Sequence, residues 1–438
     1  MLRQPEHLSL KGIRMKVCRS FSQPMLNCLV SICVQVFAST LSPAADDVTD
    51  VPNYQATPDV EWDAVFSRTE GWTGGDVAGT VDLGDGRTVW VFGDSWIGKV
   101  SHGRHASGSH MINNAIAIQR HSSLGKERAP TYDGIEFFWG PANTTRKPTA
   151  WIVPDIAPDT HWYWPTGGGI VVPGTNGKRR LVLFLFHLTK RGEKDSAWNF
   201  KHVGSAMAIV DNPGEPADKW KVRQMAIPYT VGTADSDREG PTRNTNWGVG
   251  ALLKTERRKN VLMTYLYVYG IYNAHRLNKH LMLARVPVTE IERLSQWQFY
   301  AGDGRWSSRM RDAVHIAEKM ASELSIDEYV DSGRRKYLMV HSEPAFGRRI
   351  LVRTAPMPEG QWSSPTPVYT VPGLDRGKDY FTYAAKGHLH LSRKSELLVT
   401  YIINANNIWD MAVDAAIYRP RFVRVPMAEN LRSLSGSH

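Results

Sequence analysis

A unit of three short predicted strands recurs five times along this chain and limits the folds that it can adopt. The strands are rich in β-branched and aromatic residues, turn residues separate them, and long amphipathic helical patterns are scarce. The sequence therefore predicts an all-β protein. The predicted strands of the five units are 77–83, 88–92 and 114–119; 169–172, 181–186 and 206–210; 248–253, 261–269 and 281–286; 323–326, 336–341 and 350–354; and 383–391, 397–403 and 421–425.

The recurrence of the unit favours a radial arrangement over two packed layers. Successive sheet units are typical of a β-propeller, in which radial repetition leaves only short sheet edges. A jelly roll or a two-sheet sandwich also contains many short strands and is the alternative. Trp220, Trp297 and Trp362 each follow the third strand of a unit, which favours the repeat. We expect a five-bladed β-propeller, with residues 62–67 adding an outer strand to the last blade.

The first 45 residues have the pattern of a secretory signal peptide rather than of a folded segment. Basic residues precede an apolar run at 25–38, and small residues follow it at 42–45. Met15 is an alternative start, and an uncleaved N-terminal anchor is an alternative fate. We predict a signal peptide at 1–45, a linker at 46–60, the propeller domain at 61–427 and a C-terminal tail at 428–438. The predicted location is secreted or periplasmic, with no membrane span in the mature chain.

Composition excludes several classes of function. All three cysteines (Cys18, Cys28 and Cys33) lie in the leader, so the mature chain uses no thiol chemistry and no disulfides. Its basic residues are scattered and form no stripe, which argues against a nucleic-acid partner. Weak attraction to an anionic glycan stays open. Motifs for a serine nucleophile, a phosphate-binding loop or a zinc helix are absent from the sequence.

The first unit carries a pair of aspartates at the ends of one predicted hairpin. Gly84-Asp85-Gly86 is a strong turn signal between two strand-like runs. Asp76 and Asp94 are equally far from Asp85 in the sequence, so an antiparallel register places them opposite each other. Like charges in such a pair make each other harder to ionise, which is one way in which enzymes keep an acid beside a base. We therefore predict Asp76 and Asp94 as catalytic residues.

A third carboxylate is predicted at the same end of the fold. In a propeller the first strand of each blade lines the central channel, and Glu323 opens the first strand of the fourth unit. Hydrolysis of a glycosidic bond requires two carboxylates across that bond, so Glu323 joins Asp76 and Asp94 as a candidate. The alternatives are a strand-end carboxylate that accepts backbone N–H groups for Asp94 and a solvated strand residue for Glu323.

Aromatic and amide side chains near the starts of the inner strands are candidates for substrate binding. Trp164, Trp247 and Tyr383 are predicted to stack on sugar rings, with packing between blades as the alternative. Asn404 is a candidate for binding a hydroxyl group, although it also suits an ordinary turn. His388 and His390 have the two-residue spacing of a strand, and we favour a hydrogen-bonding His388 in the channel over a metal pair. No metal or cofactor site is predicted, and a structural calcium ion stays open.

Several blocks resemble a known family. They are GGDVAGTVDLGDGRTVWVFGDSW (74–96), residues 162–169, TYAAKGHLHLSRKSELLVTYIINAN (382–406) and YRPRFVRV (418–425). They resemble a group of secreted propeller proteins long described only as a domain of unknown function, which includes bacterial endo-acting D-arabinan hydrolases. More distantly, the chain is similar to five-bladed furanosidase-type glycoside hydrolases. The resemblance spans roughly residues 60–426.

The resemblance implies a five-bladed propeller with an acidic active site at one mouth, where the family's paired aspartates match Asp76 and Asp94. The sequence departs from the expected pattern in the fifth unit, where His388-Leu389-His390 replaces a His-Pro-Glu-like motif.

These observations together predict a secreted glycoside hydrolase that cleaves a furanoside-containing or related polysaccharide. One of Asp76 and Asp94 would act as base or nucleophile, and the other, or Glu323, as proton donor. The alternatives are a noncatalytic carbohydrate-binding propeller and a structural propeller of a surface assembly. The expected partner is a polysaccharide or oligosaccharide. Endo or exo action and the stereochemical outcome stay open.

Overall fold

The structure of the protein is a computed structural model. It describes residues 56–121, 130–156, 158–174, 177–192, 199–230, 244–258, 261–275, 278–331, 333–374, 379–427 and 432–433. The predicted signal peptide and most of the predicted linker lie outside these residues. Among the residues described, no helix is long and apolar enough to cross a membrane.

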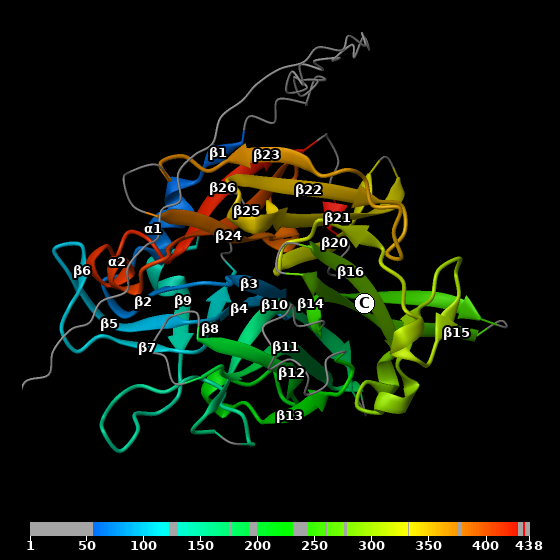
Figure 1. The fold of residues 1–438 in the computed structure, drawn as a ribbon, viewed down its shortest axis with the longest axis horizontal. Coiled ribbons are helices and arrows are strands. Elements are labelled where there is room, and N and C mark those ends of the chain that lie inside the picture. The colour runs from blue at the N-terminus through cyan, green and yellow to red at the C-terminus, as the bar shows by residue number, and fades with distance from the viewer. Residues whose placement is uncertain are drawn as a thin grey trace, which may run out of the picture. The chain divides into compact units, whose positions relative to one another are not determined.

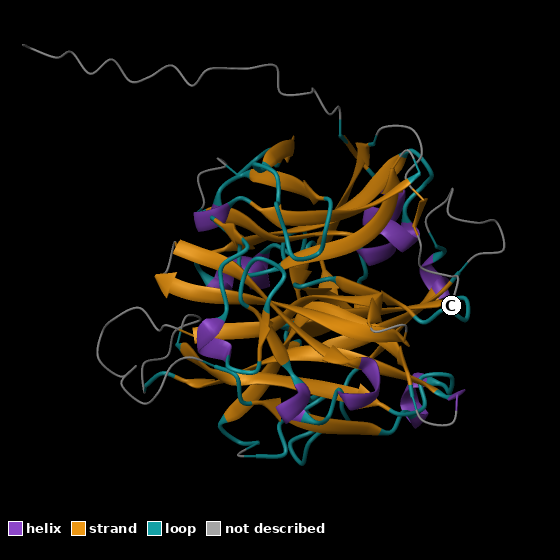
Figure 2. Ribbon diagram, turned by 90° about the vertical axis from the view of Figure 1, so that its right-hand side faces the viewer, coloured by secondary structure: helices purple, strands orange, loops and turns teal. Residues whose placement is uncertain are grey.

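The fold is all-β, as predicted, and the described helices are few and short (Figure 2). Most of the chain forms antiparallel sheets in which neighbouring strands follow one another along the chain (Figure 1). The first sheet holds β3 (Gly79–Asp82), β4 (Arg87–Phe92), β8 (Ala115–Arg120) and β9 (Ile135–Phe138). The second holds β10 (His161–Pro173), β11 (Arg179–Lys190), β12 (Phe200–Val210) and β13 (Val222–Ile227). The third holds β14 (Asn244–Arg258), β15 (Val261–His275), β16 (Asn278–Pro287), β17 (Gln298–Tyr300) and β18 (Trp306–Ser307), with β19 (Ala317–Glu318) beside β16.

Two further sheets complete this series, and both recruit a strand from an end of the chain. The fourth holds β20 (Leu324–Asp331), β21 (Arg334–Ser342), β22 (Arg349–Ala355) and β23 (Thr366–Thr370), with β27 (Arg432–Ser433) on the other side of β20. The fifth holds β24 (Tyr380–Gly387), β25 (Glu396–Ala405) and β26 (Pro420–Pro426), and β1 (Thr57–Pro58) pairs with β26 (Figure 1). N-terminal and C-terminal segments therefore share one sheet.

The predicted strands correspond to the first three strands of these five sheets, and the fourth strands were not predicted. The fourth strands β9, β13, β17 and β23 have only three to six residues each, which is too short for a clear period-two pattern. Trp220 and Trp297 stand just before β13 and β17, and Trp362 precedes β23. The recurring tryptophan therefore marks the entry to the fourth strand.

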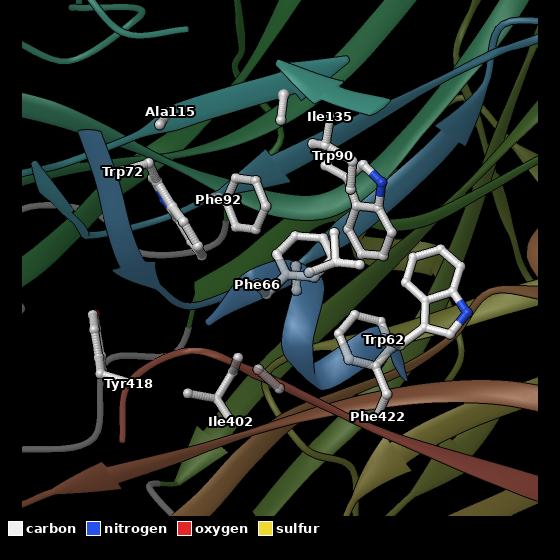
Figure 3. Close-up of a cluster of buried hydrophobic side chains, with 14 of the residues drawn as sticks. Trp62, Phe66, Trp72, Trp90, Phe92, Ala115, Ile135, Ile402, Tyr418 and Phe422 are labelled. Atoms are coloured by element: carbon white, nitrogen blue, oxygen red, sulfur yellow. The ribbon is translucent and has the colours of Figure 1, made fainter. Parts of the chain in front are cut away.

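Residues 62–67 correct the prediction of an outer strand. They lie largely in helix α1 (Val60–Phe66), which the Asp59 carboxylate caps by accepting from the Trp62 N–H at 3.1 Å. Trp62, Val65 and Phe66 share one helical face and are buried in the cluster drawn in Figure 3, where Phe66 lies 4.9 Å from Trp90 between ring centroids. The outer strand of the fifth sheet is β1 instead.

The predicted linker and tail also contain sheet residues. Thr57 and Pro58 pair with Arg424 and Val423, so the last part of the predicted linker belongs to the fold. Residues 432–433 of the predicted tail pair with 329–330 in β20.

Glycines allow the first strands of neighbouring sheets to approach each other closely. An ideal Cβ on Gly79 of β3 would lie 2.5 Å from the Gly167 Cα of β10, and one on Gly168 would lie 1.9 Å from the Gly248 carbonyl oxygen of β14. Strand β14 also contacts β20, and β20 contacts β24. A hydrogen bond of 2.7 Å joins Thr80 of β3 to His388, which directly follows β24. The first strands of all five sheets are thus linked in series.

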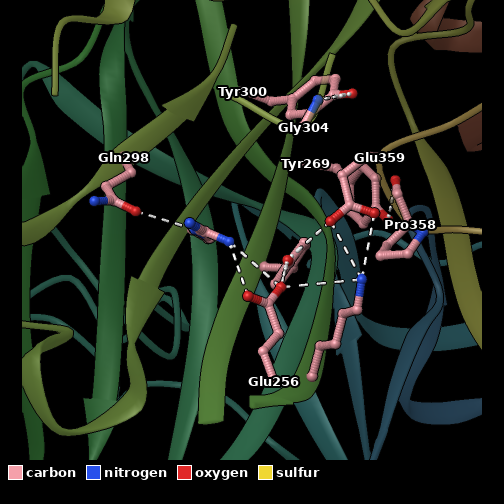
Figure 4. A network of polar contacts seen from close by, with 10 residues as sticks. Glu256, Tyr269, Gln298, Tyr300, Gly304, Pro358 and Glu359 are labelled. Carbon is pink, nitrogen blue, oxygen red and sulfur yellow. Dashed lines mark hydrogen bonds and ion pairs between the residues drawn. The ribbon is translucent and has the colours of Figure 1, made fainter. Parts of the chain in front are cut away.

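A buried polar network holds the third sheet to the segment that follows β22 (Figure 4). The Arg285 guanidinium, 1% exposed, contacts Glu256 at 3.1 Å and lies 3.8 Å from the centre of the Trp306 ring. The single O–H of Tyr267 lies within hydrogen-bond distance of both Glu256 and Glu359. Every charge in this group has an opposite charge or a donor beside it, which is the condition under which buried ions are tolerated.

Candidate active site

The two aspartates lie where the first hairpin changes sheets. Gly79 pairs with Val91 in the β3–β4 ladder, and after a break the same register pairs Gly75 with Ser95. Gly75 and Ser95 belong to a small additional sheet of β2 (Glu70–Gly75), β5 (Ser95–Ser101), β6 (Arg104–His105) and β7 (His110–Ile112). At the break, the Asp76 N–H donates to the Asp94 carbonyl oxygen at 3.3 Å. The predicted juxtaposition of Asp76 and Asp94 is therefore present in the structure.

A backbone kink interrupts the hairpin directly after Asp76. Val77 and Ala78 have φ values of 67° and 47°, a left-handed conformation that non-glycine residues rarely adopt. The strand predicted to begin at residue 77 therefore begins at Gly79. The kink separates β2 from β3 and leaves the Asp76 side chain at the junction, next to Gly93, whose ideal Cβ would lie 2.3 Å from Asp76 Oδ1. A larger residue at position 93 would occupy the space of the carboxylate.

Two tyrosines hold one oxygen of Asp76. The Tyr383 hydroxyl donates to Oδ2 at 2.6 Å and the Tyr418 hydroxyl donates to the same atom at 2.9 Å. Asn404 in turn donates to the Tyr383 oxygen at 3.2 Å. Oδ1 is buried and has no hydrogen-bond partner within the described part of the chain. A proton on this carboxyl group therefore belongs on Oδ1, because Oδ2 already accepts two hydrogen bonds.

Asp94 has a different set of donors. Its Oδ1 accepts from the Trp164 indole N–H at 2.6 Å and from the Asn113 amide at 3.3 Å. The half-buried Trp164 ring packs edge-on against Phe200, with ring centroids 4.7 Å apart. Trp164 therefore orients Asp94 through its nitrogen.

The two carboxyl groups differ in their affinity for protons. Burial raises the pKa of Asp76 to about 8, and the charges of Asp94 and Glu323 add to this effect against the two tyrosine hydrogen bonds. Burial also raises the pKa of Asp94, to about 6, while the hydrogen bonds from Trp164 and Asn113 oppose it. Between these values one carboxyl group keeps its proton and the other has lost it, which is the arrangement that acid–base catalysis requires.

Glu323 lies in the same polar group, immediately before β20. Its Oε2 accepts from the Lys386 ammonium at 2.6 Å, and Lys386 is 1% exposed. Space for this lysine depends on Gly167, where an ideal Cβ would lie 2.2 Å from Lys386 Cε. Glu323 is thus a paired carboxylate at the edge of the aspartate pair, rather than the solvated strand residue that was its alternative.

The structure brings Asp76, Asp94, Glu323, Trp164, Tyr383 and Asn404 into one neighbourhood, and it places two other candidates elsewhere. Trp247 is fully buried, packs on Phe299 and donates its indole N–H to the Tyr229 carbonyl at 2.6 Å. Its ring is not available to a sugar, which corrects the prediction that Trp247 binds substrate. This tryptophan belongs to the core.

His388 is also a core residue. It is 1% exposed, and its ring nitrogens lie 2.7 Å from the Thr80 hydroxyl and 2.8 Å from the Thr400 hydroxyl. The prediction of a substrate-binding His388 is therefore corrected, because both nitrogens are used internally. His388 and His390 do not lie on a strand either, since β24 ends at Gly387 and residues 389–391 form a 3-10 turn. Within the described residues, no group of three His, Cys, Asp or Glu side chains is placed to hold a metal ion.

Three residues of the site were not predicted: Tyr418, Asn113 and Lys386. Tyr418 precedes β26 and reaches Asp76 from the far end of the chain. Its signal in the sequence was a tyrosine three residues before a predicted strand, in the block 418–425 that carries part of the family resemblance. Lys386 lies inside a predicted strand, two residues before His388. No sequence pattern indicates that a lysine in such a strand is buried.

The chain is similar to several solved structures. A crystal structure of a candidate hydrolase from Bacteroides ovatus aligns with a TM-score of 0.61 at 20% identity, over 84% of this chain and 90% of that one. This similarity is one of fold. The catalytic domain of an alpha-L-arabinofuranosidase (GH62) from Coprinopsis cinerea aligns with a TM-score of 0.39 at 10% identity, over 82% of this chain and 92% of that one. An alpha-L-arabinofuranosidase from Lactobacillus brevis gives 0.37 at 11%, over 81% and 91%.

No curated protein sequence matches the chain. The match to a family of sequences covers residues 59–429, which include all five sheets apart from the short strands β1 and β27. The chain therefore belongs to the family described as Domain of unknown function (DUF5005).

Proposed function

We propose that this protein is an exported glycoside hydrolase that cleaves a furanoside-containing or related polysaccharide. The observation that carries the proposal is the pair Asp76 and Asp94, held on one kinked hairpin with pKa values raised to different extents. The Bacteroides ovatus protein of the same fold is described as a candidate hydrolase, and we extend that class of activity to this chain.

The proposal includes the arrangement of the sheets. We interpret the five serial sheets as the blades of a five-bladed β-propeller, with β3, β10, β14, β20 and β24 as the inner strands. The contacts between consecutive inner strands and the Thr80–His388 hydrogen bond support a closed ring. Asp76 precedes β3 and Glu323 precedes β20, so both lie at the same end of their blades. The site is then the mouth at that end.

Asp76 is the proposed proton donor. Its raised pKa keeps the carboxyl group protonated at neutral pH. The glycosidic oxygen would take this proton as the bond to the anomeric carbon breaks. The resulting Asp76 carboxylate would be stabilised by the two hydrogen bonds that it already accepts.

Asp94 is the proposed base or nucleophile. Its lower pKa leaves it ionised at neutral pH, and the hydrogen bonds from Trp164 and Asn113 occupy Oδ1, so that Oδ2 is the oxygen directed to the substrate or to water. The ion pair of Lys386 with Glu323 places a positive charge near the two aspartates and limits the total negative charge of the mouth. Glu323 is therefore a positioning and electrostatic residue in this scheme.

The test is release of reducing ends from a panel of arabinans, galactans and related polymers. Wild-type protein should cut at least one polymer, and Asp76→Asn and Asp94→Asn should each lower kcat at least a hundredfold while the protein stays folded. The matched control is Asp82→Asn, the same chemical change at the turn end of the β3–β4 hairpin, and it should retain activity. A profile of kcat/KM against pH should be bell-shaped, with limbs near the two pKa values.

Wild-type protein that binds a polymer without cutting it would identify a noncatalytic carbohydrate-binding propeller instead. Protein that neither cuts nor binds any polymer of the panel would exclude both interpretations and favour a structural role.

A further inference from the structure

A cavity lies between the first and second sheets, at the turn end of the first hairpin and away from the aspartate pair. Its volume is about 160 Å³, and pockets for drug-sized ligands typically hold roughly 300–1,000 Å³. The cavity therefore has room for one small ring rather than for a chain. Residues of β4, β8 and β9 line one side of it, and residues of the connection between β12 and β13 line the other.

One face of the first sheet forms the first side of the cavity. Arg87 of β4 pairs with Arg120 of β8, and directly opposite residues of an antiparallel pair lie on the same face. Ile118 of β8 pairs in the same way with Glu136 of β9. Side chains two residues apart on a strand share a face, which joins the two pairs and adds Phe138 of β9. All five residues therefore line the cavity from one face of the sheet.

The connection between β12 and β13 forms the opposite side. Residues 216–218 line the cavity, and Ala217 is buried in the cluster that joins the first and second sheets. The Arg87 guanidinium holds this connection in place, because it donates to the carbonyl oxygens of Pro213 at 2.6 Å and Glu215 at 3.1 Å. Both sides of the cavity are therefore fixed before a ligand binds, which lowers the entropic cost of binding.

Two charged side chains of the cavity are accessible to a ligand. Arg120 and Glu136 are exposed, and neither forms a hydrogen bond or an ion pair with any residue that the structure describes. The other two charged residues are engaged, since Arg87 donates to the connection and Asp218 lies 3.5 Å from Lys219. A ligand in the cavity would therefore meet the N–H donors of one guanidinium and the acceptor oxygens of one carboxylate.

This combination favours a neutral sugar unit over an ion. Two arginines and two carboxylates line the cavity, so their charges balance and select neither an anion nor a cation. A sugar hydroxyl both donates and accepts, so adjacent hydroxyl groups can accept from Arg120 and donate to Glu136. The half-buried Phe138 ring offers an apolar surface to the C–H face of a sugar. An apolar surface with a few polar groups that fix orientation is the usual composition of a small-ligand site.

We propose that this cavity is a second binding site, which takes a neutral sugar unit of a polysaccharide. Nearly extended chain from Arg87 to Asp94 corresponds to roughly 20 Å, so a unit bound in the cavity is not the unit at the aspartate pair. The inference goes beyond the proposed function and does not depend on cleavage. One small site binds weakly, but two sites on one polymer raise the overall affinity by about 10²–10⁴-fold over either alone.

Retention in affinity gels tests the second site. The gels contain neutral arabinan or galactan and are run in the cold, so that the polymers stay intact. The double variant Arg120→Met with Glu136→Gln removes both accessible charges of the cavity and leaves the net charge of the protein unchanged. Wild-type protein should be retained by at least one polymer, and the double variant should bind that polymer at least fivefold more weakly.

The matched control removes an exposed pair of opposite charges elsewhere on the surface. Arg305→Met with Asp303→Asn makes the same chemical change in the turn between β17 and β18, where the two side chains lie 3.3 Å apart. Its retention should stay within twofold of wild type. Both double variants should keep the melting temperature of wild type, because exposed side chains outside the core contribute little to stability.

Three results would overturn the second site: no retention of wild-type protein by either polymer, equal retention of wild type and the Arg120–Glu136 double variant, or an equal loss of retention in the control. Reducing ends are measured in parallel. Loss of retention in the Arg120–Glu136 double variant without any cleavage by wild type would contradict the proposed hydrolase and leave the second site standing. Cleavage by wild type with equal retention of both proteins would do the reverse.

Discussion

Replacing Asp76 by Asn tests the environment of the proposed acid without any knowledge of the substrate. The asparagine carbonyl oxygen can accept the hydrogen bonds from Tyr383 and Tyr418, and its amide group takes the place of protonated Oδ1. The variant therefore imitates the protonated form of Asp76 at every pH. Any difference between variant and wild type that depends on pH then reports the ionisation of Asp76.

The expected change in the free energy of unfolding follows from the pKa of Asp76, which is about 8 in the folded protein and about 3.9 in an unfolded chain. Between these values the folded state binds more protons than the unfolded state, so wild-type stability falls as the pH rises. The slope is about 1.4 kcal/mol per pH unit. From pH 5 to pH 8 wild type should therefore lose about 4 kcal/mol relative to Asp76→Asn.

Thermal unfolding followed by tryptophan fluorescence measures this difference. With an unfolding entropy of about 2.1 cal/mol/K per residue, 4 kcal/mol corresponds to roughly 5 °C for a fold of nearly 400 residues. The gap between the melting temperatures of Asp76→Asn and wild type should widen by about that amount from pH 5 to pH 8. Asp82→Asn controls for the loss of one charge from the hairpin. A gap that stays constant over this pH range would refute a raised pKa at Asp76 and, with it, its role as acid.

Three further changes test the site and the fold. Tyr418→Phe removes a hydrogen bond that stabilises ionised Asp76, so the alkaline limb of the kcat/KM profile should move up by about half a pH unit to one unit, and a shift to lower pH would contradict the assignment. Gly93→Ala places a methyl group 2.3 Å from the Asp76 carboxylate, so kcat should fall at least tenfold in an assay of reducing ends while the protein stays folded. Arg285→Met removes the closer of the two cations beside Glu256 and leaves only Lys254, at 4.0 Å, so urea unfolding should show a loss of about 3 kcal/mol; an unchanged midpoint would mean that the network contributes no net stability.

The hairpin was predictable because its register follows from one turn. A strong turn signal at Asp85 fixes the pairing of all residues on both sides, and the ladder obeys that register from Asp82 to Gly75 apart from the kink. Local physics therefore gave the position of the aspartate pair. The kink itself has no sequence signal, because Val77 and Ala78 are ordinary strand residues that the surroundings hold in a left-handed conformation.

Side-chain direction was the part that the sequence could not supply. Trp164 and Trp247 stand at comparable places in the second and third sheets, yet one indole reaches Asp94 and the other is buried on Phe299. Which tryptophan near the start of a first strand meets the site depends on contacts between sheets far apart in sequence. The same holds for Tyr418, which reaches Asp76 across 342 residues of chain. The prediction that His388 binds substrate was wrong for a related reason, because its partners Thr80 and Thr400 come from two different sheets.

A left-handed backbone conformation recurs at the first strand of four of the five sheets, including the two positions next to the site. A left-handed residue directly precedes the first strand at Ala78 and lies inside the first strand at Gly167, Gly248 and Ala384, where the strand pairing slips. Two of these positions use glycine, which tolerates this conformation without strain, whereas the two that flank Asp76 and Tyr383 use alanine, at a cost of about 1 kcal/mol each. Glycine would relieve the strain but also loosen the backbone that carries the carboxylate and its tyrosine. The positions where the fold keeps strained alanines are thus those where the proposed acid and its hydrogen-bond donor need a fixed geometry, which is how backbone strain is commonly distributed around active sites.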